Sequence, residues 1–156
     1  MGGLNSKMSY MYLEDFYVGL IRTSGEYTVS KDEIVEFARQ WDPVPFHVDM
    51  DAARESIFGG LVASSTHVFA IRSRLIHMLP VKTKLLAGFE FENLKLVAPV
   101  RPNDRLSLTI ETVYVRKSRT KPDRGIVKNC LVITNQKKET ILTSREVILV
   151  ARRKTG

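Results

Sequence analysis

The sequence predicts an α+β domain in which a long antiparallel β-sheet wraps around one buried α-helix. Residues 64–79 have the composition of a deeply buried helix, and residues 84–152 divide into four long strand-like segments separated by turns. Strands joined by short turns are typical of antiparallel sheets, and one helix is needed to fill the concave face of such a sheet. A chain of 156 residues is short for two cores, so residues 8–156 are predicted to form a single domain.

The composition indicates where in the cell this domain works and what kind of partner it binds. The longest apolar run, near residues 145–151, is far shorter than the roughly 20 residues of a membrane-spanning helix. The single cysteine, Cys130, permits no internal disulfide, so we expect a cytoplasmic protein without a membrane partner. A net charge of +7 favours an anionic partner. We interpret residues 1–7 as an expression remnant or a disordered N-terminus.

One strand and one short helix are predicted in the first part of the domain. Residues 20–29 are rich in β-branched and aromatic side chains and predict a strand that bends or bulges at Gly25. Ser30 and Glu33 have the spacing of a capping box, and the helix that follows buries residues spaced from Ile34 to Trp41. The only tryptophan, Trp41, is therefore expected in the core.

The next segment, residues 42–49, carries an acid and a base on a stiff backbone. Pro43 and Pro45 restrict their own φ angles and those of the residues before them, so this segment is predicted to be a loop and not a helix. A straight strand would hold Asp42 and His47 about 16 Å apart, so joint action requires the loop to bend back.

Two further helices are predicted before the sheet. Asp49 or Asp51 caps a short helix around residues 52–54, which Gly59 and Gly60 close. Ser64, Ser65 or Thr66 caps the second, whose apolar residues cover most of its circumference before Pro80 and predict a buried helix.

The second half of the chain predicts strands at residues 85–100, 106–117, 126–135 and 140–152. Alternation of apolar residues slips within the first of them, so a bulge is expected near Glu92 and Asn93. The short turns indicate an antiparallel meander over one buried helix. This arrangement is the hot dog fold.

From about Tyr12 onward, several blocks resemble the MaoC-like dehydratase family, a hot dog group that includes (R)-specific enoyl-CoA hydratases. The blocks that carry the resemblance are residues 12–19, 42–49, 52–53, 58–63, 99–104 and 121–127. The most specific element is the aspartate and histidine at positions 42 and 47, because it occurs within an ordered series of matching blocks.

The resemblance implies a hydro-lyase that hydrates a trans-2-enoyl thioester reversibly. Asp42 and His47 would activate the water, and the backbone N–H of Ser65, at the start of the buried helix, would bind the thioester oxygen. Family members often have glycine where this chain has Ser65. Ser73 corresponds to a serine that supports the catalytic pair in some hydratases. The implied substrate pocket contains Pro45, Phe46, Phe58, Gly60, Ser64 and Thr66.

No metal or redox cofactor is expected, and coenzyme A enters only as part of the substrate. His47, Asp49 and Asp51 lack a third convergent histidine or cysteine, which argues against a metal site. His67 and His77 are interpreted as structural or surface residues, although His67 could touch the acyl pocket. The candidates for binding the phosphates of coenzyme A are Arg101, Arg105, Arg116 and Arg119.

Two other functions are compatible with the same fold. One is a hot dog thioesterase, and the other is a non-catalytic acyl-thioester-binding or regulatory protein, which the pair Ser64 and Ser65 would favour. The acyl carrier could be coenzyme A or an acyl carrier protein. A homodimer, or an assembly of dimers, is expected because a sheet around one helix leaves an edge uncovered. No nucleic-acid-binding module is present in the sequence.

Overall fold

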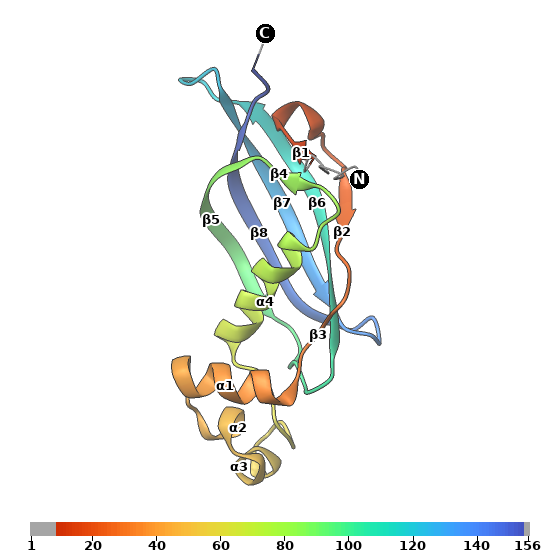
Figure 1. Ribbon diagram of the computed structural model, residues 1–156, viewed down its shortest axis with the longest axis vertical. Helices are drawn as coiled ribbons and strands as arrows, with labels where there is room; N and C mark the ends of the chain where they lie inside the picture. Colours follow the sequence, from red (N-terminus) through yellow and green to blue (C-terminus); the bar gives the residue numbers. More distant parts are fainter. Residues whose placement is uncertain (1–8, 155–156) are drawn as a thin grey trace, which may run out of the picture.

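The computed structural model describes residues 9–154 and has the predicted hot dog fold, with a long sheet curved around helix α4 (Figure 1). Helices α1, α2 and α3 cluster at one end of the sheet. The predicted remnant at residues 1–7 lies outside the described residues. In chain order the elements are β1 (Tyr10–Met11), the 3-10 helix η1 (Leu13–Asp15), β2 (Ile21–Thr23), β3 (Tyr27–Thr28), α1 (Lys31–Trp41), α2 (Pro45–Val48), α3 (Met50–Glu55), α4 (Ser65–His77), β4 (Lys82–Thr83), β5 (Leu85–Leu96), β6 (Arg105–Lys117), β7 (Arg124–Thr134) and β8 (Thr140–Ala151).

The large sheet has the strand order β2-β6-β7-β8-β5, and β3 also pairs with β6. The meander prediction is correct for β6, β7 and β8, but it is wrong for β5, which pairs with β8 and not with β6. The physical reason is that β2 and β3 occupy the other edge of β6. Strand β5 therefore crosses to the free edge of β8, and the chain crosses back through residues 97–104 to begin β6.

Two local irregularities of the strands were predicted from the sequence. The pairing of β5 with β8 shifts register between Glu92 and Lys95, where Asn93 has a φ of 50°, so the predicted bulge is confirmed. The predicted strand at residues 20–29 is broken into β2 and β3 on either side of Gly25. At the break, the backbone N–H of Ser24 donates to the Leu108 carbonyl, and the Leu108 N–H donates to the hydroxyl of Ser24 at 2.9 Å.

The capping box of α1 is confirmed. The hydroxyl of Ser30 accepts from the N–H of Glu33, and the carboxylate of Glu33 accepts from the N–H of Ser30. Helix α1 ends at Trp41 as predicted, but Trp41 is 65% exposed and not in the core. The buried residues of this helix are Ile34 and Ala38, so the surface that covers α1 ends before its last turn.

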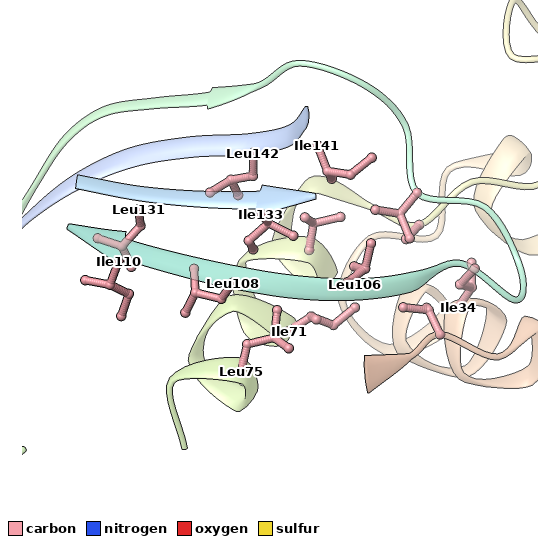
Figure 2. Packing of buried hydrophobic residues seen from close by; sticks show 14 of the residues in the cluster. Ile34, Ile71, Leu75, Leu106, Leu108, Ile110, Leu131, Ile133, Ile141 and Leu142 are labelled. Carbon is pink, nitrogen blue, oxygen red and sulfur yellow. The ribbon is translucent and has the colours of Figure 1, made fainter. Parts of the chain in front are cut away.

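Helix α4 packs on the concave face of β6, β7 and β8. Val68, Ile71 and Leu75 are its buried apolar residues, and Figure 2 shows Ile71 and Leu75 beneath the strands. Burial of such side chains stabilises the fold by roughly 1.5–3 kcal/mol each. The sheet residues of this core are Leu106, Leu108, Ile110, Leu131, Ile133, Ile141 and Leu142.

The prediction that α4 is buried around most of its circumference is wrong for the single chain. Ser65, Thr66, Ala70, Ser73 and His77 are exposed, together with Arg74. These residues lie on the sides of the helix that the sheet does not cover. One helix on one curved sheet can be covered on one side only, and mainly small or polar residues, together with Phe69, occupy the remainder.

A row of polar side chains crosses the concave face beyond the main core. Thr112, Asn129 and Glu146 are register partners on β6, β7 and β8, and all three are buried. Thr112 donates to Asn129 at 3.0 Å, and Asn129 donates to Glu146 at 3.0 Å. The guanidinium of Arg72, from α4, donates to the other oxygen of Glu146. Burial lowers the pKa of nearby Arg22, and the charge of Glu146 opposes that change.

We expect the stability of the fold to fall when the carboxylate of Glu146 is removed from this row. Glu146→Gln would leave the buried charge of Arg72 without its counter-ion, and breaking such a pair destabilises by about 3–5 kcal/mol. In urea unfolding, the loss of stability appears as a lower urea concentration at the midpoint of the transition. Glu111→Gln, on the exposed face of β6, is the matched control and should change stability by less than about 0.5 kcal/mol. Equal stability of the two variants would contradict the prediction.

Candidate active site

The segment between α1 and α3 folds back on itself and brings Asp42 close to His47. The N–H of Val44 donates to the carbonyl of Asp42 at 2.8 Å, and one turn of helix, α2, begins at Pro45. The prediction that this segment contains no helix is therefore wrong. Proline is tolerated at the first helical position, because its missing N–H has no partner there in any helix. The result is a distance of 3.9 Å between Nε2 of His47 and Oδ2 of Asp42.

The imidazole of His47 is held by a backbone atom. Its Nδ1 lies 2.6 Å from the carbonyl oxygen of Val62, and the side chain is 8% exposed. A carbonyl oxygen only accepts, so Nδ1 carries the proton. In the neutral ring Nε2 is then a free base, and this is the nitrogen that faces Asp42.

Asp42 lies at the end of α1 and is partly open to solvent. Its backbone N–H donates to Ala38 at 2.8 Å, which makes it the C-cap of the helix, and its side chain is 34% exposed. A separation of 3.9 Å is too long for a direct hydrogen bond to His47. One water molecule or substrate hydroxyl between the two groups can contact both of them.

A cavity of about 350 Å³ opens beside His47, between the start of α4 and the segment that follows β5. Its walls are mainly apolar, with Phe46, Phe58 and Val68 among them, and His47 and Ser65 supply polar groups. The ring centroid of Phe46 lies 4.5 Å from that of His47 and 5.3 Å from that of Phe58. An apolar cleft with few polar groups suits an acyl chain that carries one reactive end.

The N-terminus of α4 borders this cavity, where Ser65 forms part of the wall. Ser64 is the N-cap, and its hydroxyl accepts from the N–H of His67 at 3.2 Å. Among the described residues, the N–H groups of Ser65 and Thr66 have no hydrogen-bond acceptor outside their own helix. Ser65 has no positive φ, so the backbone here does not require the glycine that the family resemblance predicts at this position. Two free donors and the helix dipole can stabilise an oxyanion.

The other predicted pocket residues divide between the cavity and its surroundings. Phe46 and Phe58 line the cavity, while Pro45 begins α2 and Ser64, the N-cap of α4, is fully buried. Thr66 lines a neighbouring cavity of about 340 Å³ between α4 and β5, which shares Ser65 and Leu96 with the first.

Ser73 is exposed on α4, two turns beyond Ser65, and it does not line either cavity. Its supporting role remains a prediction from the family resemblance.

The four predicted phosphate-binding arginines do not lie together. The guanidinium of Arg101 lies next to Gly60 and donates at 2.7 Å to the carbonyl of Phe58, a residue of the cavity wall. Neither Arg101 nor Gly60 lines the cavity itself. Arg105 is paired with Glu26 at 3.3 Å. Arg116 is near the end of β6, about 36 Å along the strand from Arg105. Arg119 is in the hairpin that follows β6. Within one chain, only Arg101 is part of the cavity's surroundings.

His67 is not one of the described residues that line the cavity. The predicted contact between His67 and the acyl pocket is therefore not found in this part of the chain. It pairs instead with Glu33 of α1 at 3.0 Å. Burial lowers the pKa of His67, and the hydrogen bond and charge of Glu33 act in the opposite direction.

Residues 9–154 contain no group of three His, Cys, Asp or Glu side chains that could hold a metal ion. In the same part of the chain, no helix has the length and apolar character needed to cross a membrane.

Sequence reasoning missed two contacts of this site. The carbonyl oxygen of Val62 left no signal, because every residue has the same carbonyl group. The partner of His67 lies 34 positions away, and no local pattern connects the two.

The comparisons with known proteins place the chain in the hydratase and dehydratase class of hot dog proteins. The model of the MaoC like domain matches residues 20–134, and the chain belongs to this family. The chain is 36% identical to a MaoC-like dehydratase from Rhodospirillum rubrum, with a TM-score of 0.85 over 93% of this chain and 99% of that one. It is 30% identical to the uncharacterized protein YdeM of Bacillus subtilis (strain 168), over 91% of this chain and 100% of that one.

A more distant structure shows the same fold. The (R)-hydratase from A. caviae, involved in PHA biosynthesis, is 20% identical and has a TM-score of 0.69 over 86% of this chain and 97% of that one.

The buried pair of His67 and Glu33 predicts a pH dependence of stability. Because the folded pKa of His67 is below its ordinary value of 6.5, the unfolded chain binds more protons near that pH. The contribution of neutral His67 is therefore present above about pH 6.5 and is lost as the pH falls. Unfolding free energies measured from pH 7.5 to 5 should fall more steeply for the wild type than for His67→Gln. Parallel curves would contradict this.

Proposed function

We propose that the protein is a hydro-lyase that adds water reversibly to a trans-2-enoyl thioester and forms a 3-hydroxyacyl thioester. The observation that carries the proposal is the 3.9 Å separation of Asp42 and His47 beside an apolar cavity. Membership of the family supports the hydratase or dehydratase class. The thioester substrate and the roles of the two side chains are part of the proposal.

In the hydration direction, a water molecule lies between Nε2 of His47 and the carboxylate of Asp42. Since Nδ1 donates to Val62, Nε2 is free to take a proton as the water oxygen forms a bond to the β carbon. The electron pair of the double bond moves toward the thioester oxygen, and the α carbon then takes a proton from the same pair. One water is consumed and the pair returns to its starting state. Dehydration is the reverse.

The negative charge that develops on the thioester oxygen needs fixed donors. The free N–H groups of Ser65 and Thr66 supply them at the positive end of the α4 dipole. A backbone N–H is present whatever the side chain is, so serine in place of glycine retains the donor. Its hydroxymethyl group narrows the space beside the thioester, and this shapes the range of acyl groups.

The acyl chain occupies the apolar cavity, and the carrier part of the substrate extends out of the cavity past its rim. Arg101 lies beside the cavity wall with one guanidinium nitrogen on the Phe58 carbonyl, so its other donors are free for a phosphate of coenzyme A or of an acyl carrier protein. No metal or redox cofactor takes part, and the reaction is cytoplasmic.

Substitution of the pair tests the proposal directly. Asp42→Asn removes the carboxylate charge, and His47→Asn removes Nε2 while its amide can still donate to Val62. Each should lower kcat for hydration of short and medium trans-2-enoyl-CoA by about 10²–10⁴-fold, the usual contribution of general acid–base groups. Loss of absorbance from the conjugated thioester measures the rate.

Asp51→Asn is the matched control, because Asp51 is an exposed aspartate of the adjacent helix α3. It should leave kcat unchanged. Turnover by Asp42→Asn and His47→Asn at the wild-type rate would overturn the assignment. Release of free thiol without loss of the double bond would indicate a thioesterase, and binding of acyl-CoA without turnover would indicate a binding protein.

The working unit of this proposal is a homodimer. Strand β5 is an edge strand with an exposed apolar surface, and Phe91 on it packs against Phe69 of the open side of α4 at 5.2 Å. An apolar edge of this length is a template for pairing with another chain. A second copy would cover both β5 and the exposed side of α4, including Ser73. The exposed apolar residues of the edge are Leu85, Leu86, Phe89, Phe91, Leu94, Leu96 and Val97.

Sedimentation measurements test the dimer. The wild type should sediment as a dimer at micromolar concentration, and Phe89→Glu should shift the protein toward the monomer because it places a charge in the apolar interface. Ile57→Glu is the control, since Ile57 is 96% exposed and lies outside β5. A wild type that sediments as a fully active monomer would contradict the proposal.

A further inference from the structure

A second cluster of titratable side chains lies at the other end of α1 from Asp42 of the proposed catalytic pair. Oε1 of Glu33 accepts a hydrogen bond from the hydroxyl of Tyr27 at 2.9 Å, and it lies 3.0 Å from Nε2 of His67. The ring of Phe37 stacks on the imidazole, with centroids 4.4 Å apart and planes inclined by 9°. The proposed reaction uses none of these groups.

The cluster is buried at His67, and its contacts allow one arrangement of protons on the imidazole. The His67 side chain is 3% exposed, and its Nδ1 is buried without a hydrogen-bond partner in the described residues. A protonated ring would need an acceptor at Nδ1, so the ring is neutral and carries its proton on Nε2, where it donates to Glu33. A buried hydrogen bond to a carboxylate has a defined length and direction, which apolar contacts do not have.

This bond joins α1, the helix that ends at Asp42, to α4. His67 is on the first turn of α4, and Glu33 is on the first turn of α1, about 13 Å along the helix from Asp42. His47 is attached separately, through Val62, to the chain just before α4. The bond from the N–H of Val44 to the carbonyl of Asp42 bends the segment locally, and the distance between Asp42 and His47 depends further on how α1 lies relative to α4.

Apolar packing alone leaves that placement loosely defined. The buried apolar residues of α1 are Ile34 and Ala38, and the last turn, with Trp41, is exposed. Contacts of this kind resist separation of the helices more than they resist rotation or sliding of one along the other. The hydrogen bond between Glu33 and His67 fixes both.

We propose that Glu33 and His67, supported by Tyr27, are positioning residues that set the separation of Asp42 and His47. The inference rests on the proposed function, because it gives the separation its catalytic meaning. None of the three residues lines the cavity beside His47. Their effect on the reaction is exerted through the orientation of α1.

Two substitutions of His67 separate the hydrogen bond from the rest of the side chain. Glutamine can place an amide N–H near the position of Nε2, and asparagine is too short to reach Glu33. His67→Asn should lower kcat by about 10–100-fold with KM changed less than about twofold, since a displacement near 1 Å has effects of this size. His67→Gln should retain activity within about threefold of the wild type. Equal activity of wild type, His67→Asn and His67→Gln would overturn the inference.

A double-mutant cycle tests whether the effect passes through Asp42. In an Asp42→Asn background, His67→Asn should lower the residual rate by less than about threefold, because the group that it positions is already gone. The same loss in both backgrounds would overturn the inference. If His67→Asn fails to fold, Tyr27→Phe removes one of the two bonds that other side chains make to Glu33 and should give a smaller loss of kcat with the same dependence on Asp42. No loss with Tyr27→Phe would then overturn it.

Amide hydrogen exchange supplies a test that needs no turnover. In His67→Asn, exchange should become faster at residues 38–42, where the N–H of Asp42 donates to Ala38, while the core strand β7 stays protected. His67→Gln should match the wild type at both places. If the wild type proves to have no hydratase activity, the proposed function fails and this measurement alone decides whether the cluster holds α1. Unchanged exchange at residues 38–42 would overturn the positioning role.

Discussion

The hydrogen bond from His47 Nδ1 to the carbonyl oxygen of Val62 is the contact on which the candidate site depends. It is 2.6 Å long and buried, and it fixes which nitrogen of the ring carries the proton. It also attaches the short helix α2 to the segment that enters α4. Val62 is itself 2% exposed, so the position of the imidazole is determined by the packing of the main core. A loop that would otherwise be free thus takes its geometry from the central helix.

The same helix separates a closed side of the molecule from an open one. Ile71 and Leu75 bury one side of α4 against the sheet, while Ser65, Thr66 and Ser73 remain exposed on the other. The cavity beside His47 lies at this boundary and includes residues of α4 and of the chain at the end of β5. A substrate and a second copy of the chain would therefore approach neighbouring surfaces.

Predictions that depended on near neighbours in the chain were the most successful. The capping box of Ser30 and Glu33, the end of α1 before Pro43 and the bulge near Asn93 are local hydrogen-bond or steric patterns. Predictions that depended on distant contacts were less successful. The partner strand of β5 was wrong because β2 and β3 occupy the edge of β6, and Trp41 is exposed because the covering surface ends a turn earlier.

The sequence by itself determined the fold class and the presence of an acid and a base five positions apart. Only the tertiary structure decided that Asp42 and His47 are 3.9 Å apart, and not about 16 Å as in a straight strand. It also pairs His67 with Glu33, and it places Arg116 and Arg119 far along the sheet from the cavity. The physical reason is that capping, turns and alternation act between neighbouring residues. Contacts between distant residues follow from the packing of all elements together, and backbone acceptors such as Val62 have no signature in the sequence.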